Sequence, residues 1–228
     1  MLNSLYIVSS LVKKYNSVDR INKELNEVKE YWNKKLSTFK VKTPDNSFNI
    51  VMNGWYLYQT LSSRLQAKAG FYQVGGAFGY RDQLQDSINL CIVDEERAKN
   101  QIIINSSHQF KEGDVLHWWH EILMMGLRSK YKDDFLWLVY AVNKYITITG
   151  DYKILDEEIA YVDGDKLGAG EDERGITYHY TNEKYTLLEH CLASINKSMN
   201  ELGDNGLPLM GGGDWNDGMN KVGIKGKG

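Results

Sequence analysis

A glycine-rich segment near the C-terminus carries the residue types and spacing best suited to chemistry. Residues 211–218 read GGGDWNDG, so two carboxylates flank a Trp-Asn pair, and glycines at this density disfavour both helix and strand. A shaped loop can hold the indole of Trp215 and the carboxyl of Asp217 at a fixed angle. The indole would stack on the apolar face of a sugar while the acid protonates a glycosidic oxygen. A tight Asx-type turn with a packed Trp215 is the alternative interpretation.

A second segment, YQVGGAFGYRDQLQD at residues 72–86, places polar side chains beside glycines. One interpretation is that Arg81 and Asp82 hydrogen-bond sugar hydroxyls, while Gln85 and Asp86 orient them. The other is a helix N-terminus, where the helix dipole favours acidic residues. Arg81 and Asp86 are five residues apart, so they point to different sides of a helix unless the helix begins between them. A phosphate loop is discounted, because no strand is predicted before the glycines and no Gly-Lys-Ser/Thr follows them.

The third segment, HQFKEGDVLHWWHE at residues 108–121, is rich in aromatic residues and histidine. His117 and His120 invite a zinc interpretation. However, the order is not H-E-x-x-H, and we predict no metal site. An aromatic platform that includes Trp118 and Trp119, with His117 as a donor and acceptor for sugar hydroxyls, fits the segment better.

Helices must position these segments, because alternating β-branched runs are nearly absent. Residues 4–36 read as one amphipathic helix, and Pro44 interrupts the pattern before a helix that Asp45 or Ser47 could cap. Residues 101–104 (QIII) are the only strand-like stretch. Further helices are predicted over residues 48–69, 82–93, 94–106, 131–149, 153–159 and 181–202.

The ends of these helices carry recognisable signals. Asp133-Asp134 before an apolar run indicates a helix start, with capping as its simplest role, and Gly150 and Gly203 end two of the helices. Long connections rich in glycine and aromatic residues are more often functional than connective. We therefore predict an all-α chain in which helix pairs form a toroid with its loops gathered at one end.

The composition narrows the class of protein further. Of 228 residues, 42% are hydrophobic and 25% are charged, which is typical of a soluble globular protein. The net charge of −3 gives no electrostatic case for binding nucleic acid or an anionic membrane. Cys91 and Cys191 lack metal-ligand spacing and are predicted to be small buried hydrophobes. No stretch reaches the roughly 18–20 apolar residues that a membrane span needs, so we expect a cytoplasmic protein.

Together these segments resemble glycoside hydrolase family 94, the inverting glycoside phosphorylases. They are most similar to the phosphorylase-type domain of cyclic β-1,2-glucan synthases and to β-1,2-oligoglucan phosphorylases. The family fold is an (α/α)6 barrel preceded by a β-sandwich and a helical linker. The resemblance therefore implies a helical linker over residues 1–40 and the N-terminal portion of a partial (α/α)6 barrel over residues 41–228. It rests on GGAFGYRDQLQD (75–86), HQFKEGDVLHWWHE (108–121), DDFLWLVYAVNKYITITGD (133–151) and GLPLMGGGDWNDGMNKVG (206–223).

The resemblance also implies roles for single residues. Asp217 matches the family's general acid, with Trp215 and Asn216 beside it in the sugar site. Inorganic phosphate, the co-substrate, replaces the activated water of an inverting hydrolase and attacks the anomeric carbon, so one carboxylate suffices. No other cofactor is implied. Together with the residues read from the segments themselves, the predicted substrate contacts are Arg81, Asp82, Gln85, Asp86, His117, Trp118 and Trp119.

The leading hypothesis is a fragment of a phosphorylase that cleaves a β-linked glucan, expected to be β-1,2, to α-glucose 1-phosphate. The fragment is expected to be truncated and inactive by itself, with a homodimer possible in the full-length protein. One alternative is the chain-length-controlling domain of a cyclic β-1,2-glucan synthase, tethered to the membrane through other parts. A hypothesis of another class is a noncatalytic carbohydrate-binding remnant that does no chemistry but keeps the tryptophans Trp55, Trp118, Trp119 and Trp215.

Overall fold

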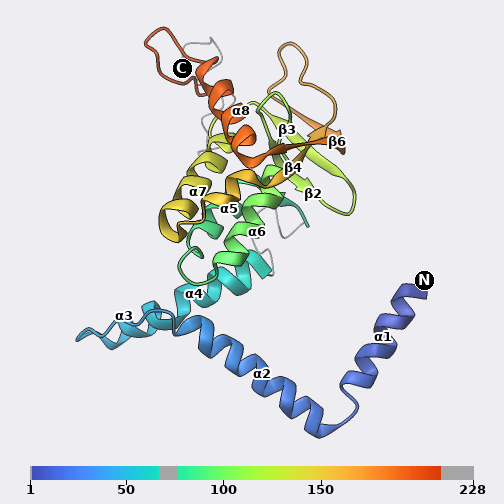
Figure 1. The fold of residues 1–228 in the computed structure, drawn as a ribbon, viewed down its shortest axis with the longest axis vertical. Coiled ribbons are helices and arrows are strands. Elements are labelled where there is room, and N and C mark those ends of the chain that lie inside the picture. Colours follow the sequence, from blue (N-terminus) through green and yellow to red (C-terminus); the bar gives the residue numbers. More distant parts are fainter. Residues whose placement is uncertain (1, 67–75, 212–228) are drawn as a thin grey trace. The chain divides into compact units, whose positions relative to one another are not determined.

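The computed structural model describes residues 2–66 and 76–211. Contacts within the chain define two compact units, Met1–Tyr58 and Gln59–Gly228 (Figure 1). Each unit is described by itself. The predicted domain boundary at residue 40 falls inside the first unit, and the division into a linker and a catalytic portion stays a prediction.

Helices make up the first unit. Residues 4–36 were expected to form one helix, but the structure has two, α1 (Leu2–Lys14) and α2 (Val18–Leu36). The break occurs because the Ser17 side chain accepts a hydrogen bond from the backbone N–H of Arg20, which starts a new helix. The Lys14 ammonium pairs with Glu24 across the break at 2.8 Å.

The remainder of the first unit confirms the predicted cap. Asp45 accepts hydrogen bonds from the backbone N–H groups of Ser47 and Phe48 at 2.8 and 3.1 Å, and α3 (Asn46–Ile50) follows. The chain then continues through a π-helical turn (Val51–Trp55) into α4 (Tyr56–Gln59).

The second unit begins with a π-helical segment (Thr60–Gln66) and adds four longer helices. These are α5 (Tyr80–Ile88), α6 (Glu95–Ser106), α7 (Asp134–Thr149) and α8 (Leu187–Met199). Helix α7 contacts α5, α6 and α8 and so lies at the centre of the helical layer. Gly150 ends α7 with a φ of 72°, as its position predicted.

Strands form the other part of the second unit, so the predicted all-α fold is wrong. An antiparallel four-stranded sheet has the order β1-β2-β3-β5, and β4 pairs with β6 in a separate two-stranded sheet. Figure 1 shows the helices gathered on one side of this unit and these strands on the other. The strands are β1 (Phe78–Gly79), β2 (Leu116–His120), β3 (Met125–Ser129), β4 (Glu158–Asp163), β5 (Glu173–Thr177) and β6 (His179–Thr186).

Two predicted helices were wrong because they ran into these strands. The helix expected over residues 181–202 begins only at Leu187, where Thr186 and Glu189 form a reciprocal capping box. The short helix expected over residues 153–159 is a 3₁₀ helix (Tyr152–Asp156), and β4 starts immediately after it. Conversely, the strand-like residues 101–104 lie within α6. The toroid of helix pairs is therefore replaced by helices packed against antiparallel sheets.

Cys91 and Cys191 are buried free thiols, as predicted. Among the described residues, no helix is both long enough and apolar enough to span a lipid bilayer.

Candidate functional site

The N-terminal ends of α5 and α7 bring an arginine and two carboxylates together. Arg81 Nη1 lies 3.8 Å from Asp133 Oδ2, and Arg81 Nε lies 3.9 Å from Asp82 Oδ1. Both separations exceed hydrogen-bond distance. The Arg81 side chain is only 11% exposed. A largely buried guanidinium is thus held between two carboxylates without a direct hydrogen bond to either.

Local sequence explains this arrangement. Gly79 precedes α5, and a Cβ at this position would lie 2.8 Å from Asp82 Oδ2. Glycine therefore leaves room for the Asp82 carboxylate to fold back over the helix N-terminus, where the helix dipole favours negative charge. Because α5 begins at Tyr80, Arg81 and Asp86 both lie within it, about 140° apart around the helix axis. They point to different sides, and Gln85 is exposed between them.

Asp133 and Asp134 do not act as a helix cap. Asp133 occupies the N-cap position of α7, but its side chain makes no capping hydrogen bond. Instead the buried Asp134 Oδ2 accepts a hydrogen bond from His117 Nδ1 at 2.7 Å, which joins β2 to α7. The imidazole of His117 also stacks on Tyr131, with ring centroids 4.5 Å apart. The hydrogen bond and the stack fix the orientation of the histidine.

The glycine-rich motif starts beside this cluster. Its first residue, Gly211, forms an isolated antiparallel bridge with Tyr131, the residue that stacks on His117. Gly211 has a φ of 64°, and a Cβ there would lie 2.6 Å from the Lys130 carbonyl oxygen, so only glycine fits. Asp217, Trp215 and Asn216 lie outside the described residues, and their predicted roles stay predictions.

Trp118 and Trp119, the two tryptophans of the predicted aromatic platform, are successive residues of strand β2 and face opposite sides of it. Successive side chains of a strand face opposite sides, so His117 and Trp119 are buried while Trp118 and His120 are partly exposed. Trp119 is fully buried, with its ring between Phe78 and His108 at centroid distances of 5.7 and 4.0 Å. Its packing in this structure is that of a core side chain, whereas Trp118 retains accessible surface.

The buried His108 is held neutral by its surroundings. Its Nδ1 lies 2.8 Å from the Ile104 carbonyl oxygen, and its Nε2 lies within 3.3 Å of the hydroxyls of Tyr178 and Tyr180. Burial lowers its pKa to about 4. His190, for which the sequence suggested no partner, bonds the buried Gln109 amide at 2.8 Å, and burial likewise lowers its pKa to about 4.

Because His108 and His190 are buried, we expect the stability of the fold to decrease in acid. An unfolded histidine binds a proton near pH 6.5, whereas folded His108 and His190 do so only near pH 4. The unfolded state therefore gains protons first, and stability should fall as the pH drops from about 6.5 to about 4, by up to ~3 kcal/mol for each histidine. Urea denaturation at pH 7 and pH 4.5 measures the loss. His190→Gln should reduce the difference between the two pH values; an unchanged difference would contradict this assignment.

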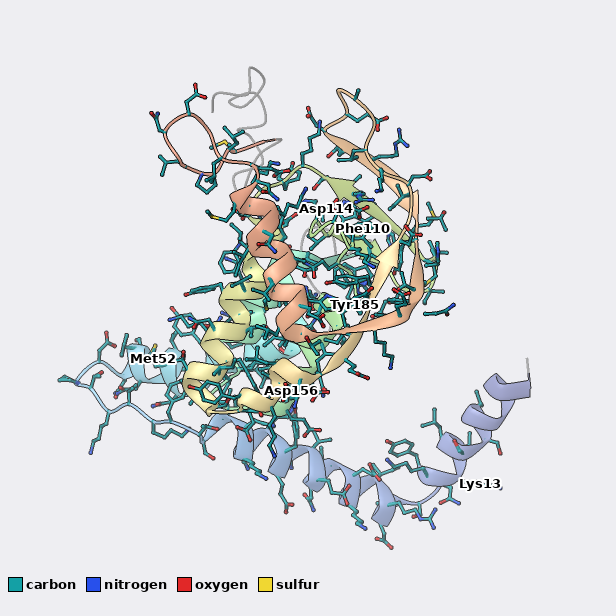
Figure 2. All side chains as sticks on the ribbon, turned by 45° about the horizontal axis from the view of Figure 1, so that its top comes forward. Lys13, Met52, Phe110, Asp114, Asp156 and Tyr185 are labelled. Atoms are coloured by element: carbon teal, nitrogen blue, oxygen red, sulfur yellow. The ribbon has the colours of Figure 1, made fainter. Side chains whose placement is uncertain are left out.

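The sequence analysis did not identify the buried ion pair between Arg128 and Asp114. Arg128 donates two hydrogen bonds to Asp114, from Nε at 2.6 Å and from Nη2 at 2.9 Å. Its guanidinium also lies over the Phe110 ring at 3.7 Å. Burial alone would lower the pKa of Arg128, but the hydrogen bonds to Asp114 raise it overall. Figure 2 labels Asp114 and Phe110, which lie close together next to the strands.

Within residues 2–66 and 76–211, no group of three or more His, Cys, Asp or Glu side chains is arranged to hold a metal ion.

The chain belongs to the glycosyl hydrolase 94 superfamily. The model of that family's catalytic domain matches residues 31–228, which confirms the resemblance carried by the motifs. Similar proteins include the cyclic beta-(1,2)-glucan synthase NdvB of Rhizobium meliloti (strain 1021), 40% identical over 210 residues. The solabiose phosphorylase of Paenibacillus borealis is 34% identical over 188 residues, and the 1,2-beta-oligoglucan phosphorylase of Listeria innocua is 25% identical over 169 residues.

These alignments cover most of the chain but little of the relatives. They include 92%, 82% and 72% of the chain, respectively, yet only 7%, 21% and 14% of the relatives' length. The chain therefore spans only a small part of the length of these relatives.

Proposed function

We propose that this chain is part of an inverting glycoside phosphorylase that cleaves a β-linked glucan, preferably β-1,2-linked, with inorganic phosphate. The family match over residues 31–228 supports the reaction class. Two of the similar proteins are named for β-1,2-glucans, which supports the linkage. The observation that carries the proposal is the match to the glycosyl hydrolase 94 catalytic domain. The Arg81 side chain, held near Asp82 and Asp133, supplies polar groups for sugar hydroxyls.

The proposed reaction exchanges one bond at the anomeric carbon. A phosphate oxygen attacks this carbon from the face opposite the leaving group, the glycosidic C–O bond breaks, and Asp217 gives its proton to the departing oxygen. Inversion converts the β-linkage into α-glucose 1-phosphate. Arg81 and Asp82 hold hydroxyls of the sugar on the non-reducing side, and Asp86 supports them from the next turn of α5. Trp118, His117, Trp215 and Asn216 complete the sugar contacts; phosphate is the only co-substrate.

A second candidate is the chain-length-controlling domain of a cyclic β-1,2-glucan synthase. The 40% identity to such a synthase over 92% of the chain favours it. Both candidates use the same sugar site, and they differ in what the rest of the protein does.

One assay tests the reaction class. Phosphate release from α-glucose 1-phosphate is measured with sophorose as acceptor and with cellobiose as the linkage control. It is run on residues 1–228 and on the full gene product that contains them. Since no phosphate-binding residue is assigned in this chain, release by the full product alone is the expected result. Faster release with cellobiose would contradict the β-1,2 preference, and no release by either protein would favour the synthase domain or a binding remnant.

A further inference from the structure

A cavity of about 250 Å³ lies between the residues that follow β3 and the C-terminal end of α8. Positive charges outnumber negative charges on its wall. Among the residues that the structure describes, three carboxylates line it, those of Glu112, Asp114 and Glu201. Five cationic side chains also line it, those of Arg128, Lys130, Lys132, Lys166 and Lys197. The wall therefore carries a net charge of +2, whereas the whole chain carries −3.

One excess charge belongs to two lysines that share a carboxylate. Lys132 and Lys197 both donate a hydrogen bond to Glu201, Lys197 at 3.1 Å. Burial by itself would raise the pKa of Glu201, but the hydrogen bond and the charge of Lys132, together with Lys197, lower it overall. Glu201 is therefore ionised near neutral pH, and its single negative charge faces two positive ones.

The other excess charge is that of Lys130. Its ammonium lies 3.7 Å from the Asp172 carboxylate, which exceeds hydrogen-bond distance. The Asp172 side chain is 67% exposed, so water screens this pair. The two remaining cations of the wall are matched by Asp114 and Glu112. Lysines alone thus carry the positive excess.

These charges restrict what the cavity can hold. The Lys132 and Lys197 side chains are only 17% and 22% exposed, and a charge with little water around it attracts an anion more strongly. Each ammonium has three N–H donors, of which one bonds Glu201. A neutral or apolar occupant would leave the excess charge uncompensated, and a carboxylate would neutralise only half of it. A phosphate dianion neutralises both charges and offers several acceptor oxygens.

We propose that this cavity is a binding site for a phosphate group, held by Lys130, Lys132 and Lys197. A cavity of this volume has room for several water molecules, and Phe135 and Leu167 add an apolar part to its wall. The phosphate group can therefore be free or attached to a small organic molecule. α-Glucose 1-phosphate is the ester to test, a choice that rests on the proposed function. The attacking phosphate of the proposed reaction is not assigned to this cavity.

Direct binding tests the site without turnover. Inorganic phosphate and α-glucose 1-phosphate are each titrated into residues 1–228 at pH 8 and low ionic strength, with the heat of binding as the readout. Lys132→Gln removes one charge-assisted hydrogen bond and should weaken phosphate binding by about tenfold or more. Lys132→Arg keeps the charge and should lose less affinity. Lys184→Gln is the matched control, because it makes the same change of charge at an exposed lysine that does not line the cavity.

The two ligands distinguish the two sources of the phosphate group. Tighter binding of α-glucose 1-phosphate would assign the cavity to a sugar phosphate, and equal or tighter binding of inorganic phosphate would assign it to the free ion. No binding of either ligand by the folded wild type would overturn the site. Equal affinity of Lys132→Gln and the wild type, or an equal loss in Lys184→Gln, would overturn it as well. If Lys132→Gln does not fold, Lys130→Gln gives the same comparison at a side chain that is 37% exposed.

This result does not depend on the proposed reaction. Phosphate binding that Lys132→Gln weakens would support the site even if the full gene product releases no phosphate from α-glucose 1-phosphate. Conversely, release by the full gene product without phosphate binding by residues 1–228 would overturn the site and leave the reaction in place.

Discussion

Replacing Asp217 by asparagine in the full gene product should lower the rate of phosphate release from α-glucose 1-phosphate by about two to four orders of magnitude. Phosphate release is the reverse of the cleavage, so in this assay Asp217 accepts the proton of the acceptor hydroxyl that it would donate to the leaving oxygen in the cleavage. Asparagine keeps the size of the side chain but can neither accept nor donate this proton. Phosphate supplies the nucleophile in the proposed reaction, so Asp217 is the single carboxyl group that acts on the scissile bond. The loss should appear mainly in kcat, because the proton is transferred in the transition state.

Asp214→Asn is the matched control for this prediction. It makes the same change of charge three residues earlier in the same glycine-rich motif. Its rate should stay within about tenfold of the wild type. Comparable losses in both variants would show that the motif needs negative charge in general, and an active Asp217→Asn enzyme would remove Asp217 from the role of acid.

Helices could be predicted from the sequence where a residue at their first or last turn carries a strong local signal. Gly150 ends α7 and Asp45 caps α3, because each acts on backbone groups within a few residues. Ser17 shows where such a signal was overlooked: its side chain restarts a helix inside a periodic pattern that appeared continuous.

The strands could not be predicted, since their stability comes from distant partners. Strand β6 is mostly exposed and polar, with no alternation of apolar residues. It is a strand because β4, about twenty residues earlier, supplies the hydrogen-bonding edge. Strand β2 likewise takes its place between β1 and β3, although its aromatic sequence read as a loop.

The sequence identified some of the residues of the candidate site, but it did not identify the contacts that hold them in place. Arg81 and His117 were singled out from the sequence, but the carboxylates that position them, Asp133 and Asp134, were read as a helix start. Their partners lie 52 and 17 residues away along the chain, from Asp133 to Arg81 and from Asp134 to His117. Such pairings follow from the packing of α5, β2 and α7, which no local pattern encodes.

The Arg128–Asp114 pair is the part of the fold that should tolerate substitution least. The Arg128 side chain is 4% exposed and that of Asp114 is 10% exposed, so each charge is removed from most of its water. The two parallel hydrogen bonds compensate for this desolvation. Removing the negative partner leaves a buried guanidinium whose charge cannot be lost, because arginine does not deprotonate in proteins.

Asp114→Asn should therefore lower the free energy of unfolding by about 3–5 kcal/mol, the range for breaking a buried ion pair. Urea denaturation at pH 7, followed by circular dichroism, measures this loss. Glu112→Gln is the control, because Glu112 bonds the same arginine at 3.2 Å but its side chain is 41% exposed. Water and Lys166 screen that interaction, so its loss should be below about 1 kcal/mol. Equal losses in the two variants would mean that water reaches Arg128 in solution and that burial does not set the strength of the pair.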